Sequence, residues 1–339
     1  MQPITTRFTK LLNIKTPIVA APMAFASTAD LAAAVTGAGA FGLFGMGFDS
    51  TAVIKQNFQT IRDRLKIAKG SSVPVGIGCI GWILEMTESS DDPRLNVILE
   101  EQPQVIWFAF GVDLGKYVAQ VRAYDAKRDH KTLVFVIVNS VEEALRAANE
   151  WKVDVLVVQG NEAGGHGGSR SPPMISVVQD VVSAIPNGPP ILAAGGVSSG
   201  GQVAALLTLG ASGVVLGTRF LFTPECCYSD AQKSVLIESD YNATQRALCF
   251  DDVGRTNFWP PFHNGRAIAN RIWDEFKEGL SLDERLKRHD DNKENKDRLI
   301  IWAGVGVGAT KEIKPAADVV TELHEDALKA LKASATLIG

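Results

Sequence analysis

The sequence has little cysteine, and its cysteines are not arranged as a metal or disulfide site. Cys79, Cys226, Cys227 and Cys249 are the four cysteines, and no two of them have the Cys-x-x-Cys spacing of zinc ligands or redox pairs. Free thiols of this kind are typical of reducing compartments. We therefore expect no structural metal and predict a cytoplasmic location.

Long apolar runs and a basic surplus are also absent. No stretch reaches the roughly 18 apolar residues of a membrane-spanning helix, and the first residues contain no signal-like run. The chain has 34 Lys and Arg against 38 Asp and Glu, a net charge of −4. This balance argues against nucleic acid or an anionic membrane as the partner, and we expect a small-molecule ligand instead.

Eight short apolar runs follow one another along the first two thirds of the chain, separated by helix-like segments. The runs are apolar throughout, as expected for a parallel sheet that is covered on both faces. Eight strand–helix units in succession predict an α/β fold of the (β/α)₈ TIM-barrel type, and a doubly wound open sheet fits less well. The predicted strands are 17–23, 40–45, 73–78, 105–110, 132–138, 153–160, 189–196 and 211–218.

The alternation of apolar runs and helix-like segments ends after the eighth run. Residues 224–300 are helix-like, rich in charge and without a strand pattern, so we predict a helical insertion that caps the active-site face. The charge run at 286–298 is interpreted as a solvated face. The barrel is then expected to comprise 1–223 and 301–339, closed by a helix within that second segment.

Glycines end the seventh and eighth predicted strands, as Gly195–Gly196 and as Gly217 before Thr218. In TIM barrels active sites gather at the carboxyl ends of the strands, and phosphate commonly binds after strands seven and eight. Glycines let backbone amides approach an anion closely. A tight strand-to-helix turn explains one such pair equally well, but the two loops together favour a phosphate site.

A histidine among glycines follows the sixth strand, in QGNEAGGHGGSR (159–170). We expect His166 to lie on a flexible loop, where its usual pKa near 6.5 suits proton abstraction. A solvent-exposed histidine and a metal ligand are the alternatives; no chelating carboxylate or second histidine is suitably spaced. The other histidines are expected at the surface, although His263 could overhang the site: His130, His263, His289 and His324.

An ordered set of motifs resembles the nitronate monooxygenases, formerly called 2-nitropropane dioxygenases. The set is APMA (21–24), QGNEAGGHGG (159–168), AAGGV (193–197) and LGTRF (216–220), supported by NGRAIAN (264–270) and WAGVGVG (302–308). Each motif alone is weak, but the ordered set is specific and spans nearly the whole chain.

The resemblance implies non-covalent FMN, with O₂ oxidising alkyl nitronates, and neutral nitroalkanes, to a carbonyl compound and nitrite. His166 matches the family's catalytic base. By the same comparison the ring would be contacted by Pro22, Met23, Gly78, Gln159 and Gly164, and the phosphate by Gly195, Gly196, Gly217 and Thr218.

Two positions depart from the family pattern. Gly78 stands where many members have Asn, and Ile137 where many have Gln or Lys. Both missing groups would lie near the flavin, whose reduction potential they would influence. Asn139, two residues further along the same side of the strand, is a possible substitute.

The resemblance leaves other functions open. FMN-dependent NAD(P)H oxidoreductases acting on enoyl thioesters or quinones share the barrel and the histidine loop, and a non-catalytic flavin-binding barrel is a third reading. No GxGxxG follows a strand, but relatives bind NADH without one. Aromatic residues expected near the pocket fit a small apolar substrate or ordinary packing equally well: Phe25, Trp82, Phe110 and Trp259.

Overall fold

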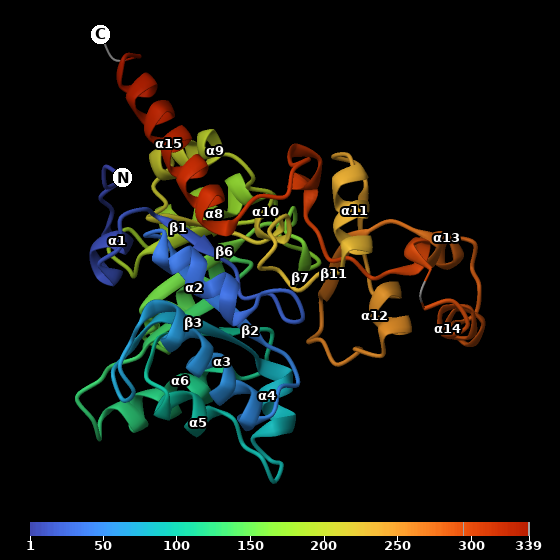
Figure 1. The fold of residues 1–339 in the computed structure, drawn as a ribbon, viewed down its shortest axis with the longest axis horizontal. Helices are drawn as coiled ribbons and strands as arrows, with labels where there is room; N and C mark the ends of the chain where they lie inside the picture. The colour runs from blue at the N-terminus through green and yellow to red at the C-terminus, as the bar shows by residue number, and fades with distance from the viewer. Residues whose placement is uncertain (294, 338–339) are drawn as a thin grey trace.

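The computed structural model describes residues 1–293 and 295–337, in which eight parallel strands close into a barrel (Figure 1). β9 pairs with β1 through Ile18 and Val214, which completes the ring. The predicted TIM barrel is therefore confirmed. In order around the barrel the strands are β1 (Ile18–Ala20), β2 (Phe41–Met46), β3 (Val73–Ile80), β4 (Pro103–Ala109), β5 (Leu133–Val138), β6 (Val155–Gln159), β8 (Ile191–Ala194) and β9 (Gly213–Leu216).

Helices surround the strands, and many begin at a Ser, Thr or Asp whose side chain caps the first turn. None of the described helices is long and apolar enough to cross a membrane. The helices of the barrel are α1 (Arg7–Leu12), α2 (Ala29–Gly37), α3 (Thr51–Leu65), α4 (Gly81–Thr87), α5 (Leu95–Glu100), α6 (Leu114–Asp125), α7 (Val141–Asn149), α8 (Met174–Ala184), α9 (Gly200–Thr208), α10 (Thr218–Leu221) and α15 (Ala316–Ala335), with the 3₁₀ turn η2 (Val305–Ala309) before α15.

The barrel interior is filled at its amino-terminal end. Phe8 of α1 is fully buried and meets Phe135 of β5 edge-on, with ring centroids 6.0 Å apart. Phe41 and Trp107 complete this layer of large side chains. Because side chains close this end, a ligand can enter only at the carboxyl ends of the strands.

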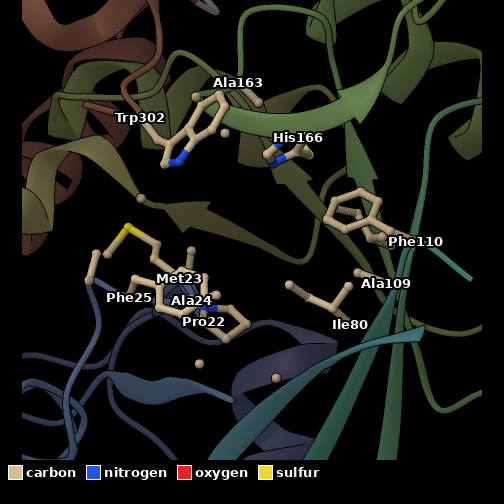
Figure 2. A pocket seen from close by; sticks show the side chains of 18 of the residues that line it. Pro22, Met23, Ala24, Phe25, Ile80, Ala109, Phe110, Ala163, His166 and Trp302 are labelled. Atoms are coloured by element: carbon tan, nitrogen blue, oxygen red, sulfur yellow. The ribbon is translucent and has the colours of Figure 1, made fainter. Parts of the chain in front are cut away.

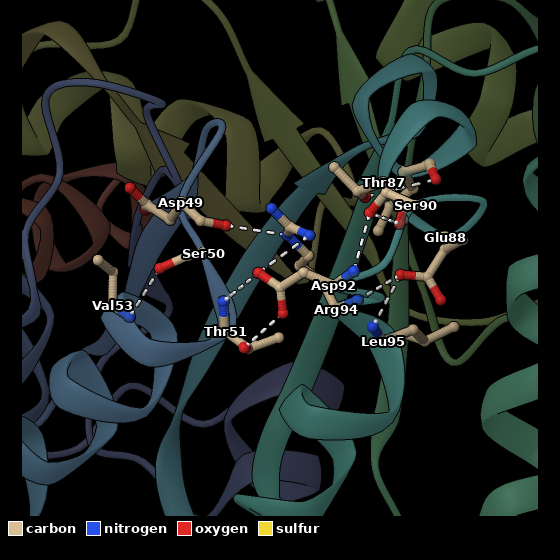
Figure 3. Close-up of polar contacts among 11 residues, drawn as sticks. Asp49, Ser50, Thr51, Val53, Thr87, Glu88, Ser90, Asp92, Arg94 and Leu95 are labelled. Carbon is tan, nitrogen blue, oxygen red and sulfur yellow. Dashed lines mark hydrogen bonds and ion pairs between the residues drawn. The ribbon is translucent and has the colours of Figure 1, made fainter.

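A polar cluster fixes the loop between β2 and α3 (Figure 3). Asp92 accepts hydrogen bonds from the backbone N–H of Thr51 at 3.2 Å and from its hydroxyl at 2.6 Å. Arg94, largely buried, donates through Nε to the carbonyl of Asp49 at 3.1 Å and lies 3.3 Å from Asp92. These contacts tie the β3–β4 connection to the loop that carries Phe48.

The segment 224–300 lies to one side of the barrel, in orange in Figure 1, and is not purely helical. The prediction that it contains no strand is wrong, because β10 and β11 pair antiparallel there. Both strands are short and half polar, so only tertiary pairing reveals them. The elements are α11 (Asp230–Glu238), β10 (Thr244–Ala247), α12 (Cys249–Gly254), β11 (His263–Ile268), α13 (Arg271–Lys277), α14 (Leu282–Asp290) and η1 (Lys296–Arg298).

The glycine-rich segment is a strand rather than a flexible loop. Residues Gly165–Gly168 form β7, which pairs antiparallel with β11 and places His166 opposite Gly265. Residues 294, 338 and 339, which fall within the predicted insertion and barrel segments, lie outside the described residues.

The charge run is only partly a solvated face. Arg298 is largely buried and donates to the buried carboxylate of Glu275, with Nη1 and Oε2 3.1 Å apart. Arg288 donates to the same carboxylate at 3.2 Å. These hydrogen bonds hold the pKa of Glu275 below its usual value, and they fasten α13 to α14 and η1.

Candidate active site

A cavity of about 560 Å³ opens at the carboxyl ends of the barrel strands, between the barrel and the 224–300 segment. In Figure 2, His166 and Trp302 lie on one side of it, and Pro22, Met23 and Phe25 lie opposite. The structure thus brings the predicted residues to one place. The lining includes Pro22, Met23, Gly78, Gln159, Gly164, His166, Gly195, Gly196, Gly217 and Thr218.

Residues whose backbone amides are unpaired line this cavity after β8 and β9. The N–H groups of Gly195, Gly196, Gly217 and Thr218 donate to no acceptor within 1–293 and 295–337. Gly195 and Gly196 have φ of 116° and 69°, a conformation that side chains disfavour. The hydroxyl of Thr218 accepts from the N–H of Gly304 at 2.9 Å, which joins this corner to η2. Gly195, Gly196, Gly217 and Thr218, called the phosphate cradle below, thus offer uncharged hydrogen-bond donors suited to an anion.

Gln159 and its neighbours hold β7 in position. The Gln159 Nε2 donates to the carbonyl of His166 at 3.2 Å, and its Oε1 accepts from Asn139 Nδ2 at 3.0 Å. Asn139 is buried and does not line the cavity, so it orients Gln159 rather than replacing the family's missing polar groups. Arg246 of β10 donates to the carbonyl of Gly167 at 2.9 Å. The backbone around His166 is therefore rigid.

His166 is paired with a carboxylate that the sequence analysis missed. Its Nε2 lies 2.8 Å and 3.0 Å from the two oxygens of Asp251, which is fully buried in α12. Thr256 and Trp259 also donate to Asp251 Oδ1, each at 2.9 Å. A carboxylate only accepts hydrogen bonds, so we assign the proton to Nε2 and the lone pair to Nδ1. No pattern in CFDDVG marks this aspartate, because the pair forms across 85 positions.

Two tryptophans enclose the imidazole. Trp259 stacks on it with centroids 3.4 Å apart and planes 7° from parallel, and Trp302 packs at 4.5 Å. A Cβ on Gly265 would lie 2.9 Å from His166 Nε2 and 2.3 Å from Trp302, so only glycine leaves room for both rings. With its side chain 9% exposed, His166 is not a solvent-exposed loop residue.

The environment of His166 lowers its pKa. Burial is the main cause, while the hydrogen bond and charge of Asp251 oppose it, and Arg246 and His263 lower the pKa further. The imidazole is therefore neutral at neutral pH, as a base must be.

The other histidines do not line the cavity. His263 packs edge-on against Phe110, with ring centroids 5.7 Å apart, and does not line the cavity. The expectation that His324 is a surface residue is wrong, because it is fully buried and lies 2.8 Å from the carbonyl of Gln2.

Gly78 and Ile137, the two positions that depart from the family pattern, leave apolar surface in the cavity. Ile137 lines it directly. At Gly78 an added Cβ would lie 2.3 Å from Cβ and 2.5 Å from Cγ of Pro22, so the proline ring occupies the space that a side chain would need. Pro22 and Gly78 are thus a matched pair.

We expect Gly78→Ala to lower the free energy of unfolding by about 1–3 kcal/mol, the usual cost of overpacking a rigid contact. Urea denaturation measures this. Gly201→Ala is the control, because a Cβ there meets nothing closer than 4.0 Å and alanine favours the helix. An unchanged midpoint for Gly78→Ala would show that Pro22 yields to an added Cβ.

Comparisons with known proteins show the family and agree with the fold. A family model described as nitronate monooxygenase matches residues 5–66 and 65–326. A nitronate monooxygenase of Neurospora crassa is 30% identical, over 93% of this chain and 90% of that protein. Among solved structures, FabK from Thermotoga maritima aligns with a TM-score of 0.77 at 26% identity, covering 99% and 98% of the two chains. A nitroalkane oxidase from Streptomyces ansochromogenes aligns at 0.76 and 26%, covering 96% and 99%.

Proposed function

The chain belongs to the nitronate monooxygenase family of oxidoreductases, and from this premise we propose that it uses FMN and O₂ to oxidise alkyl nitronates and neutral nitroalkanes. The products are a carbonyl compound and nitrite. One observation carries the proposal: His166, with Asp251 on Nε2, presents a neutral ring to a cavity that also contains unpaired amides. The cytoplasmic location and the subdomain boundaries at 223/224 and 300/301 remain predictions.

The residues present are suited to FMN. The amides after β8 and β9, with the Thr218 hydroxyl, would hold the phosphate, and a charged partner is not required for this. Pro22 and Met23 would face the apolar ring, with Gln159 and Gly164 at its edge. When bound there, FMN would supply the acceptor for the substrate's electrons, which O₂ would finally receive.

His166 would act on neutral nitroalkanes as a general base. Nδ1 takes the proton from the carbon that bears the nitro group, and the C–H electron pair stays on the substrate as the nitronate anion. Asp251 then pairs with the imidazolium through the Nε2–H bond, while Trp259 and Trp302 keep water from the ring. A preformed nitronate needs no proton removal, and the imidazolium would hold it by charge.

A second candidate is an FMN-dependent NAD(P)H oxidoreductase that uses the same cavity. The fold likeness to FabK from Thermotoga maritima, with a TM-score of 0.77, favours this alternative. The two candidates differ in what reduces the flavin, so a single mixing experiment distinguishes them.

We expect the purified protein to be yellow and to release FMN, rather than FAD, on heating. Anaerobic mixing with ethyl nitronate is expected to change the flavin absorbance, and admitting O₂ is expected to restore it. NADH in the parallel sample is expected to have little effect. Rapid bleaching by NADH with indifference to nitronate would instead establish the second candidate, and a colourless protein that takes up no FMN would contradict both.

A further inference from the structure

We propose that the preferred nitronate carries a long apolar or aromatic substituent, bound along an aromatic wall made of Phe25, Phe48, Trp82, Phe110 and Trp259, and that a second charge on the substrate is excluded. This inference rests on the proposed function and names the substrate class of the same site. The sequence alone left a small apolar substrate and ordinary packing equally open.

The wall is continuous from the candidate base to the surface. Trp259, stacked on His166, meets Trp82 with centroids 5.5 Å apart, and Trp82 meets Phe48 at 5.7 Å. Phe48 in turn meets Phe25 at 6.3 Å. Trp82 is buried, whereas Phe48 is 47% and Phe25 60% exposed, so the wall ends in uncovered apolar surface at the mouth.

The wall and the phosphate cradle occupy different parts of the barrel mouth. Phe25, Phe48, Trp82 and Phe110 follow β1, β2, β3 and β4 in turn, while the unpaired amides follow β8 and β9. A cofactor phosphate in the cradle would therefore not occupy the wall itself. A nitronate of two carbons at His166 would leave most of it uncovered.

The backbone at two wall residues is held in a conformation that bulky side chains avoid. Phe25 has φ of 64° and Phe110 has φ of 58°, both in the left-handed region. A Cβ on Gly47 would lie 2.8 Å from the Phe25 ring, so glycine there makes room for it. Strain of this kind concentrates at ligand sites, where the position of the side chain matters.

The described lining of the cavity offers a substrate no charged side chain along the wall. Of the described residues that line it, none is Lys, Arg, Asp or Glu. Arg94 donates through Nε to the carbonyl of Asp49 and forms an ion pair with Asp92, as Figure 3 shows, although its buried Nη1 makes no hydrogen bond to the described residues. Arg246 donates to the carbonyls of Gly167 and Asn264. A substrate carboxylate held beside Trp82, which is buried, would thus be desolvated with no Lys or Arg side chain in the described cavity lining to balance it.

The test compares nitronates that differ only in the substituent. For the holoenzyme we expect kcat/KM to rise about threefold per methylene along the series of ethyl, butyl and hexyl nitronate, near the value for transferring one CH₂ from water. The nitronate of 6-nitrohexanoate, with the same chain and a terminal carboxylate, is expected to be more than about tenfold poorer than that of 1-nitrohexane.

Binding without turnover gives a second measurement. Hexanoate and adipate present a planar two-oxygen anion like a nitronate, and their Kd values follow from the change in flavin absorbance. We expect hexanoate to bind more than about tenfold more tightly than adipate. Phe48→Ala should reduce the preference for the hexyl over the ethyl nitronate, whereas Phe276→Ala should not, because Phe276 is 44% exposed on α13 and outside the cavity.

The outcomes separate the two proposals. Oxidation of ethyl nitronate with no dependence on chain length, or equal binding of hexanoate and adipate, overturns the aromatic-wall proposal and leaves the proposed function intact. Failure to oxidise any nitronate, together with preferential hexanoate binding, overturns the proposed function. It leaves standing the inference that the aromatic wall binds an apolar substituent and disfavours a second charge.

Discussion

His166→Asn should reduce kcat/KM for neutral nitroalkanes by about 10²–10⁴-fold, the usual contribution of a general base. Asparagine can still donate a hydrogen bond toward Asp251, but it offers no lone pair of suitable basicity to the substrate. Preformed nitronates should lose much less, because their proton has already been removed. Steady-state oxygen consumption with nitroethane and with ethyl nitronate measures both values.

His130→Asn is the matched control for this variant. His130 lies 3.0 Å from the carbonyl of Pro103 at the start of β4, at the end of the barrel away from the cavity, and its replacement should leave both substrates unaffected. FMN content and circular dichroism would show that His166→Asn is folded. Equal losses on the two substrates would mean that His166 serves binding and not proton abstraction.

Asp251→Asn should lower kcat/KM for nitroalkanes by about 10²–10³-fold, between the effects of losing an orienting partner and of losing the base itself. The amide can donate to Nε2, which favours the tautomer with the proton on Nδ1. Nδ1 is then protonated and cannot accept the proton from the substrate. It also removes the negative charge that balances the imidazolium. Both effects require the hydrogen bonds seen between His166 and Asp251.

The pH profile distinguishes this role from a merely structural one. Activity on nitroalkanes requires neutral His166, so it is lost as the pH falls through the pKa of this histidine, which burial holds below its usual value near 6.5. Asp251 raises that pKa. Its removal should therefore move the fall in activity at low pH, the acid limb of the profile, to lower pH. A simple loss of folded enzyme would lower the plateau and leave the limb in place.

Asp252→Asn provides the control for the pH experiment. Asp252 is adjacent in sequence but pairs with Arg285 at 3.0 Å and lies outside the cavity. The variant should keep the limb at the wild-type pH. If the Asp251→Asn limb stays there as well, the carboxylate does not tune His166.

The cavity lining is apolar around Gly78 and Ile137. Pro22 fills the space above Gly78, and Ile137 presents an apolar side chain. The aromatic wall extends the same character to the surface. These features together favour an uncharged substituent on the substrate and, near the flavin ring, an environment with few hydrogen-bond donors.

Much of the fold follows from local sequence because its strands and helices are separately encoded. The runs around Ile18, Val105 and Val155 are apolar on both faces, which is the pattern of a buried parallel strand. The helices that follow the first two runs, α2 and α6, are capped by Thr28 and Asp113. The glycines at 195, 196 and 217 also follow from position alone, since a barrel gathers the carboxyl ends of its strands at one face. That reasoning placed His166 at the mouth as well.

What local sequence could not reveal depends on contacts between distant segments. β7 contains only glycine and His166, so nothing in its own residues favours a strand, and pairing with β11 alone makes it one. The same pairing converts an expected flexible loop into a rigid support and buries the imidazole between Trp259 and Trp302.

The sequence by itself thus determined the barrel and the face on which the site lies, because both depend on periodicity and strand order, while the catalytic role of His166 stays a prediction from its motif. Only the tertiary structure decided that Asp251 is its partner, that Nδ1 is the free nitrogen and that five aromatic side chains form one wall. The physical reason is that a hydrogen bond or an aromatic contact depends on separations of a few ångströms, which chain positions tens to hundreds of residues apart do not specify.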